Sequence, residues 1–129
     1  TDSQDESDAL KAIRNIETQN WNKNDIYELL GRGEKKRIGI YAVSKIAKKI
    51  IKIAKSIKEL DKTEIFIYDS NPDIQGNYVE NCKVLSPEDI ELHYLDCLII
   101  ASDLYYDEIY EKYKFLEERG IQIKGVTYE

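Results

Sequence analysis

The sequence has few of the residues on which metal sites, disulfide frameworks and histidine-based active sites depend. Its 129 residues include two cysteines, one histidine and no methionine. Cys82 and Cys97 lie in apolar, strand-like segments without the paired spacing of a zinc site, so we expect buried thiols. His93 stands alone in its segment, and we expect a structural or surface histidine. We therefore predict neither a metal site nor a catalytic residue.

Long hydrophobic runs are also absent. The most apolar stretch, residues 97–101, is far shorter than the ~20 residues that span a bilayer. No hydrophobic leader is present, so we expect a soluble, cytoplasmic protein. Because Thr1 is not an initiator residue and methionine is missing, we expect a processed product or an excised domain of a longer protein.

The charge is acidic overall but unevenly distributed. The formal net charge of −6 disfavours binding to nucleic acid, whereas residues 32–62 contain eleven Lys or Arg against three acidic residues. Part of this excess recurs at helical spacing, at Lys45, Lys48, Lys49, Lys52 and Lys55. We interpret this row as a solvated helix face, or as a docking surface for an acidic partner, including the chain's own acidic start. No aromatic residue is interleaved for base stacking, which makes nucleic acid the less favoured partner.

Three regions follow one another along the chain. Residues 1–8 are polar and acidic, and we expect them to be disordered. Residues 9–33 predict a helical lead-in: apolar positions recur at helical spacing from Ala9, and Asn24 and Asp25 precede a second short helix that ends at Gly31 and Gly33. Residues 34–129 form the main domain.

The main domain alternates strand and helix patterns, which predicts a mainly parallel sheet covered on both faces. Strands are expected at 38–42, 64–69, 82–85, 97–101 and 121–126. The 97–101 strand is the most hydrophobic and is expected to be central. A long helix is predicted over 44–60, another begins at the cap Ser86, and a third starts at Ser102 or Asp103 and ends at Gly120.

In an open α/β sheet, ligands bind outside the carboxyl ends of the strands. This rule selects three turns: Ala42–Ala47, Asp69–Asn71 and Ser102–Asp103. The first begins a helix, whose free N–H groups and partial positive charge favour a phosphate. We therefore predict a cofactor site formed by Ala42, Val43, Ser44, Lys45, Asp69, Ser70, Asn71, Ser102 and Asp103.

The first turn lacks the glycines that a dinucleotide-binding turn, G-x-G-x-x-G/A, normally carries. Ala42, Ser44 and Ala47 occupy those places. Ala42 would carry roughly 1–2 kcal/mol of strain if the position is left-handed. The Ser44 hydroxyl either donates to a phosphate, with Lys45 as counter-charge, or simply caps the helix.

Asp69 is the strongest single candidate. A carboxylate at the end of the second strand can accept hydrogen bonds from a ribose diol. It can equally accept them from the backbone in a turn over Ser70 and Asn71, and the two uses are compatible.

The segments Ile38–Lys48, Ile67–Pro72 with Gly76, Val84–Asp89 and Leu98–Ser102 together carry a family resemblance. Residues from about 36 to 126 resemble the small NAD(P)-binding-type domains attached to enzymes of nucleotide-sugar and surface-polysaccharide biosynthesis. The resemblance implies a Rossmann-like three-layer α/β sandwich. It also implies that Asp69 occupies the acidic ribose-binding position.

Three functions remain open. The first is an accessory domain of a larger enzyme that binds a nucleotide or nucleotide-sugar weakly or acts as a scaffold. The second is an enzyme domain that uses NAD(P) or a nucleotide-sugar, for which Tyr110 and Lys114 have the Tyr-x-x-x-Lys spacing of some dehydrogenases. The third is a protein-interaction domain that docks through the basic helix.

Overall fold

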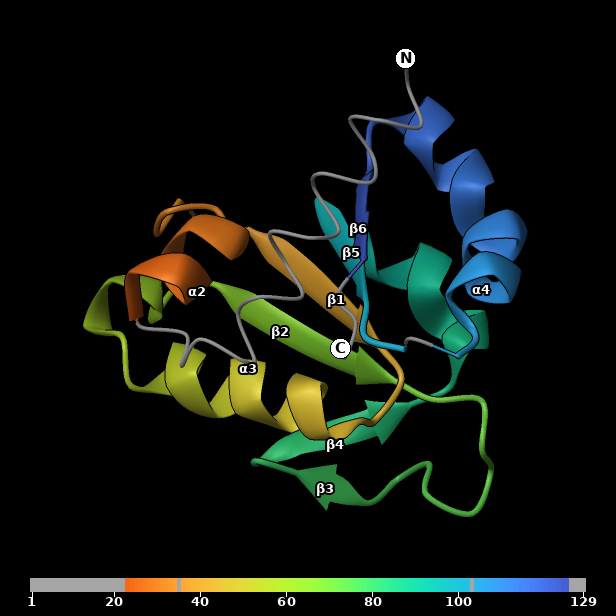
Figure 1. Cartoon of the computed structure of the whole chain (residues 1–129), viewed down its shortest axis with the longest axis horizontal. Coiled ribbons are helices and arrows are strands. Elements are labelled where there is room, and N and C mark those ends of the chain that lie inside the picture. Colours follow the sequence, from red (N-terminus) through yellow and green to blue (C-terminus); the bar gives the residue numbers. More distant parts are fainter. Residues whose placement is uncertain (1–22, 35, 103, 126–129) are drawn as a thin grey trace.

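The computed structural model describes residues 23–34, 36–102 and 104–125, which form a six-stranded sheet between two helical layers (Figure 1). The strand order is β3-β4-β2-β1-β5-β6. Five strands run parallel: β1 (Arg37–Tyr41), β2 (Glu64–Tyr68), β4 (Cys82–Leu85), β5 (Cys97–Ile100) and β6 (Gln122–Gly125). The predicted three-layer α/β sandwich with a mainly parallel sheet is therefore confirmed.

The centre of the sheet is the β2–β1 pair, so the prediction that the 97–101 strand is central was wrong. All four residues of β5 are buried, yet β5 lies one strand from the β6 edge. Helices cover both faces of the sheet as far as β5. The apolar character of this strand therefore indicates that both of its faces are buried, and it does not indicate where the strand lies in the sheet.

One helical layer consists of α2 (Lys23–Leu29), α3 (Lys45–Lys55) and a 3₁₀ turn η1 (Lys58–Leu60). Helix α3 ends before the predicted boundary, because the Ser56 hydroxyl donates to Ile53 O at 2.6 Å and Ile57 is extended. Asn24 and Asp25 lie inside α2 and do not precede it. As predicted, Gly31 and Gly33 follow this helix with positive φ.

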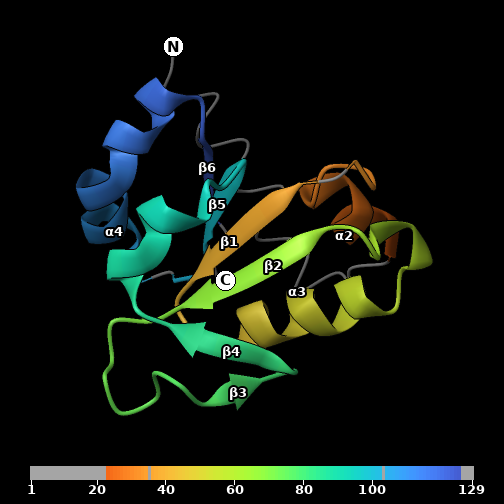
Figure 2. The same cartoon turned by 180° about the vertical axis from the view of Figure 1, so that it is seen from behind.

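The other layer consists of η2 (Pro87–His93), α4 (Tyr106–Tyr113) and η3 (Lys114–Arg119), and it covers the opposite face of the sheet (Figure 2). Ser86 accepts a hydrogen bond from Glu88 N at 3.3 Å, which confirms the predicted cap, although a 3₁₀ helix follows. This layer approaches the sheet closely at Gly39. A Cβ there would lie 2.5 Å from Leu95 Cδ1 and 2.9 Å from the Tyr68 ring.

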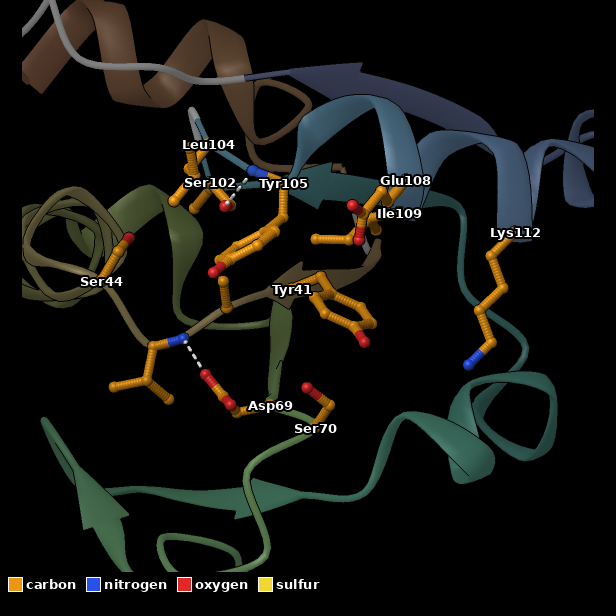
Figure 3. A pocket seen from close by; sticks show the side chains of 13 residues that line it. Tyr41, Ser44, Asp69, Ser70, Ser102, Leu104, Tyr105, Glu108, Ile109 and Lys112 are labelled. Atoms are coloured by element: carbon orange, nitrogen blue, oxygen red, sulfur yellow. Dashed lines mark hydrogen bonds between the residues drawn. The ribbon is translucent and has the colours of Figure 1, made fainter.

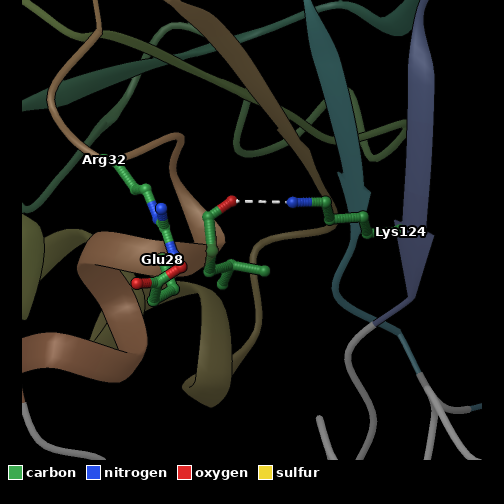
Figure 4. Close-up of polar contacts among 4 residues, drawn as sticks. Glu28, Arg32 and Lys124 are labelled. Carbon is green, nitrogen blue, oxygen red and sulfur yellow. Dashed lines mark hydrogen bonds and ion pairs between the residues drawn. The ribbon is translucent and has the colours of Figure 1, made fainter.

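The two edges of the sheet differ. β3 (Tyr78–Val79) is a two-residue antiparallel strand that pairs with β4, too short for a hydrophobic period to indicate it. At the other edge, Lys124 Nζ in β6 donates to Leu29 O at 3.0 Å, which attaches α2 to that strand (Figure 4). Beside this contact, Arg32 and Glu28 form an ion pair with an N···O distance of 2.7 Å.

Several expectations fall outside the described residues. These are the disordered segment 1–8, the lead-in helix that begins at Ala9, and the roles of Asp103 and Val126. Within the described ranges, none of the helices combines the length and the apolar character needed to cross a bilayer.

Candidate functional site

A cavity of about 690 Å³ opens where the carboxyl ends of β1, β2 and β5 meet the start of α4 (Figure 3). This size is typical of a small-molecule site. The cavity has two sides. One consists of the turns after β1 and β2, and the other consists of residues on α4 and just before it. Its lining residues are Tyr41, Ala42, Val43, Ser44, Asp69, Ser70, Ala101, Ser102, Leu104, Tyr105, Glu108, Ile109 and Lys112.

Ala42, directly after β1, has φ +90°, the left-handed conformation that glycine normally supplies. Ala42 N donates to Tyr68 O at 2.8 Å, so the neighbouring strand holds the turn in this conformation. For an alanine this conformation costs roughly 1–2 kcal/mol. The chain therefore keeps the backbone shape of a glycine turn without the glycine.

Ser44 is the N-cap of α3. Its backbone is extended (φ −128°, ψ 170°), and its hydroxyl accepts from Ala47 N at 3.1 Å. The capping interpretation is thus confirmed. The N–H groups of Lys45 and Ile46 have no intrahelical acceptor, because the residues four positions earlier lie outside the helix.

Asp69 connects the two turns of the cavity. Its Oδ2 accepts from Val43 N at 2.8 Å, and its Oδ1 accepts from Asn71 N at 2.9 Å. Gln75 Nε2 donates to the Asp69 carbonyl at 2.8 Å and fixes the loop further. The predicted turn over Ser70 and Asn71 is confirmed. Since an ionised carboxylate has about four lone-pair sites, acceptor capacity is left on both oxygens.

The α4 side presents both apolar and charged groups. Leu104 is 81% exposed and Tyr105 is 54% exposed, and both line the cavity. The Ser102 hydroxyl accepts from Tyr105 N at 3.2 Å, which positions that residue (Figure 3). One turn farther along the helix, Glu108 and Lys112 line the cavity at i, i+4 spacing. This side therefore joins an exposed aromatic ring to a carboxylate and an ammonium group.

Tyr41 of the cavity lining packs against a second buried tyrosine, Tyr113, which lies outside the lining. Tyr41 and Tyr113 have ring centroids 5.6 Å apart. Burial raises the pKa of Tyr41, whereas interaction with the Ser70 hydroxyl lowers it. Burial, followed by the proximity of Tyr41, raises the pKa of Tyr113 to about 12. Both hydroxyls are therefore protonated at neutral pH, and that of Tyr41, which lines the cavity, can donate to a ligand.

Most of the predicted site residues come together here. Ala42, Val43, Ser44, Asp69, Ser70 and Ser102 line the cavity. Lys45 and Asn71 do not line it, and Asp103 lies outside the described residues. The sequence analysis missed Tyr41, Leu104, Tyr105, Glu108 and Lys112. The spacing of Tyr105, Glu108 and Lys112 at i, i+3 and i+7 was the available signal.

The other candidates lie away from the cavity. Tyr110 donates to Glu117 Oε1 at 2.7 Å and Lys114 pairs with Glu111, so the Tyr-x-x-x-Lys pair does not face the site. His93 packs against Phe66, with its Nδ1 2.6 Å from the Tyr68 hydroxyl, in a structural role. Cys97 is buried as predicted, whereas Cys82 is only partly buried.

Solved structures with this fold include those of a repressor. The crystal structure of RSP, a Rex-family repressor, matches with a TM-score of 0.58 at 17% identity, and the structure of RSP in complex with β-NADH matches with a TM-score of 0.55 at 18% identity. Each match covers 85% of this chain and 53% of the other, so the chain spans about half the length of these relatives. No curated protein sequence matches. Residues 34–123, more than half of the chain, match a family described as C2185-like, N-terminal, and the chain therefore belongs to this family.

Proposed function

We propose that this domain binds a nucleotide in the cavity at the carboxyl ends of β1, β2 and β5. The observation that carries the proposal is the left-handed Ala42 at the start of α3. A non-glycine residue persists in such a conformation only where the surrounding structure imposes it, and such residues cluster at ligand sites. The Val43–Asp69 hydrogen bond helps to impose this turn, which directs the α3 N-terminus at the cavity.

The RSP structure supports a dinucleotide as the ligand class, because that protein was crystallised with β-NADH. In the present domain, the N–H groups at the start of α3 would contact a phosphate. The remaining lone pairs of Asp69 would accept from a ribose. The exposed ring of Tyr105 would lie against a base or a nicotinamide.

We expect this binding to be weak. Val43 N–H is already bonded to Asp69, and the Ala42 and Ser44 side chains occupy positions where glycines would admit a pyrophosphate. Loss of one hydrogen bond to a charged group removes about 1.5–3 kcal/mol. Affinity about tenfold to a hundredfold below that of a site with a free N–H and glycines follows.

An accessory role in a longer protein fits this site better than catalysis. Neither His93 nor either cysteine lines the cavity. Among the described residues, the lining serines bond to backbone N–H groups or to Tyr41 and not to a lining carboxylate or to Lys112, so no serine is paired with a base. The resemblance to domains of nucleotide-sugar and polysaccharide enzymes adds nucleotide-sugars to the candidate ligands. The NAD(P)-dependent enzyme remains the alternative, with catalytic groups supplied by another part of the protein.

Isothermal titration of the domain with NADH, NADPH, UDP, UDP-sugars and S-adenosylmethionine tests the proposal. Asp69→Ala is expected to abolish binding. Asp73→Ala, in the same loop but outside the cavity lining, is the matched control and should leave binding unchanged. The proposal fails if none of these ligands binds at millimolar concentration, or if Asp69→Ala binds as tightly as the unmodified protein.

A further inference from the structure

Three cationic side chains lie on the α4–η3 segment, and they differ in whether they form an ion pair. Lys114 Nζ pairs with Glu111 at 2.8 Å, and Arg119 pairs with Glu91 at 2.5 Å. Lys112 forms no ion pair with any described residue. Its ammonium lies 5.6 Å from the centroid of the Tyr113 ring, and its side chain lines the cavity. Lys112 is thus the cation of this segment that remains available to a ligand.

Two hydroxyl groups face the same part of the cavity. In Figure 3 the Lys112 side chain points toward the region where the Tyr41 and Ser70 hydroxyls lie. The Tyr41 hydroxyl stays protonated at neutral pH because burial raises its pKa, and the Ser70 hydroxyl, which hydrogen-bonds to Tyr41, is exposed and can turn toward a ligand. An ammonium group with two hydroxyl donors is a suitable set of partners for phosphate oxygens.

The start of α3 is less favourable for a second anionic group. The Asp69 carboxylate lies there and accepts the Val43 N–H, and the Ser44 hydroxyl accepts from Ala47 N. The negative charge of Asp69 also opposes part of the positive potential at the start of α3. A ligand with an additional phosphate therefore gains more from the Lys112 side.

We propose that Lys112, together with the Tyr41 and Ser70 hydroxyls, forms a phosphate subsite of this cavity. The proposal rests on the nucleotide-binding function proposed above and specifies which nucleotides the site prefers. Glu108, one turn before Lys112, also lines the cavity and repels phosphate, so the subsite is confined to the Lys112 end. The phosphate is either the 5′-phosphate of a mononucleotide or the 2′-phosphate of a dinucleotide.

Two ligand pairs that each differ by one phosphate provide the test: adenosine with AMP, and NADH with NADPH. In the unmodified protein, the phosphate-bearing member of at least one pair should bind about tenfold more tightly, the effect of one charge-assisted contact. Lys112→Gln should reduce that preference to less than about twofold. Lys114→Gln, the neighbouring lysine outside the cavity lining, should preserve it. The pair that responds identifies the phosphate position.

Ser70→Ala is the second variant and should reduce the same preference about threefold, as expected for one hydroxyl donor. A preference that survives in Lys112→Gln, or the absence of a preference in both pairs, overturns the subsite while nucleotide binding stands. Failure of all four ligands to bind the unmodified protein overturns the subsite. The nucleotide-binding proposal is overturned as well if UDP, the UDP-sugars and S-adenosylmethionine also fail to bind. Matching circular dichroism spectra of the variants and the unmodified protein exclude unfolding as the cause.

Discussion

The two sides of the cavity differ in how their polar groups are satisfied. On the turn side, the Asp69 carboxylate accepts from Val43 N and the Ser44 hydroxyl accepts from Ala47 N, so these side chains bond to the protein's own backbone. On the α4 side, Glu108 and Lys112 form no ion pair with described residues, and Tyr105 is 54% exposed. The turn side therefore maintains the shape of the site. The α4 side adds a carboxylate and an ammonium group that form no ion pair with described residues.

Among the substitutions that test this difference between the two sides, Asp69→Ala is expected to have the largest effect on stability. The change removes the acceptors for Val43 N and Asn71 N, so the free energy of unfolding should fall by about 2–3 kcal/mol. Urea denaturation measures this fall in the free energy of unfolding. Lys112→Ala on the other side should change stability by less than about 0.5 kcal/mol. Equal losses in the two variants would contradict the division of roles.

Alkaline pH tests the buried tyrosines below the α4 side. The folded protein favours protonated Tyr113, whose pKa is raised to about 12 by burial first and by Tyr41 second. Its contribution to stability is complete below about pH 10, the usual tyrosine pKa. It is lost as the pH rises from about 10 to 12.

Tyr113→Phe should therefore show a smaller fall in unfolding free energy over this pH interval, measured by urea denaturation. Tyr78→Phe is the control, because Tyr78 is 69% exposed, and it should follow the unmodified protein. If both variants follow the unmodified protein, titration of Tyr113 does not contribute to the loss of stability at alkaline pH.

Ala42→Gly tests whether the turn after β1 is strained. Glycine relieves roughly 1–2 kcal/mol of left-handed strain and loses about 0.5–1 kcal/mol to unfolded-chain entropy. Thermal denaturation should show a net gain of about 0.5–1 kcal/mol. NADH should also bind several-fold more tightly. The same change within α3, Ala54→Gly, is the control and should destabilise the domain. A loss of stability in both variants would contradict left-handed strain at Ala42.

Glu108→Gln is expected to have the smallest effect. Removing this exposed carboxylate reduces repulsion at the Lys112 end, so AMP should bind about two- to threefold more tightly, since exposed charges interact weakly. Adenosine serves as the uncharged comparison and should be unaffected. Titration at low and high salt should show that the gain diminishes with ionic strength. An equal gain for adenosine would indicate a steric origin.

The sequence predicted the turn side well because local rules govern it. Ser44 before a helix and Asp69 after a strand have short-range signatures, and the strand-end rule placed their turns together. The α4 side was missed because Glu108 and Lys112 belong to an exposed helical pattern. Whether such residues face solvent or a cavity depends on how the helix docks on the sheet, which is a long-range property.

Two errors in the predicted fold share an origin, because both came from the pattern of apolar residues. The 97–101 strand was assigned to the centre from its hydrophobicity, but coverage by helices on both faces gives the same apolar pattern next to the edge. The long helix was extended to residue 60 because its apolar period continues past Lys55. The Ser56 hydroxyl bond to Ile53 O and the extended Ile57 end it earlier.

The most direct test of a nucleotide site in this cavity is a ¹H–¹⁵N NMR titration of the domain with NADH. The account predicts that the largest shift changes fall on both sides of the cavity, at Ala42–Ser44, Asp69–Ser70 and Tyr105–Lys112. Small changes are expected on the outward lysines of α3. Changes confined to those lysines, or no changes at millimolar NADH, would contradict a dinucleotide site in the cavity.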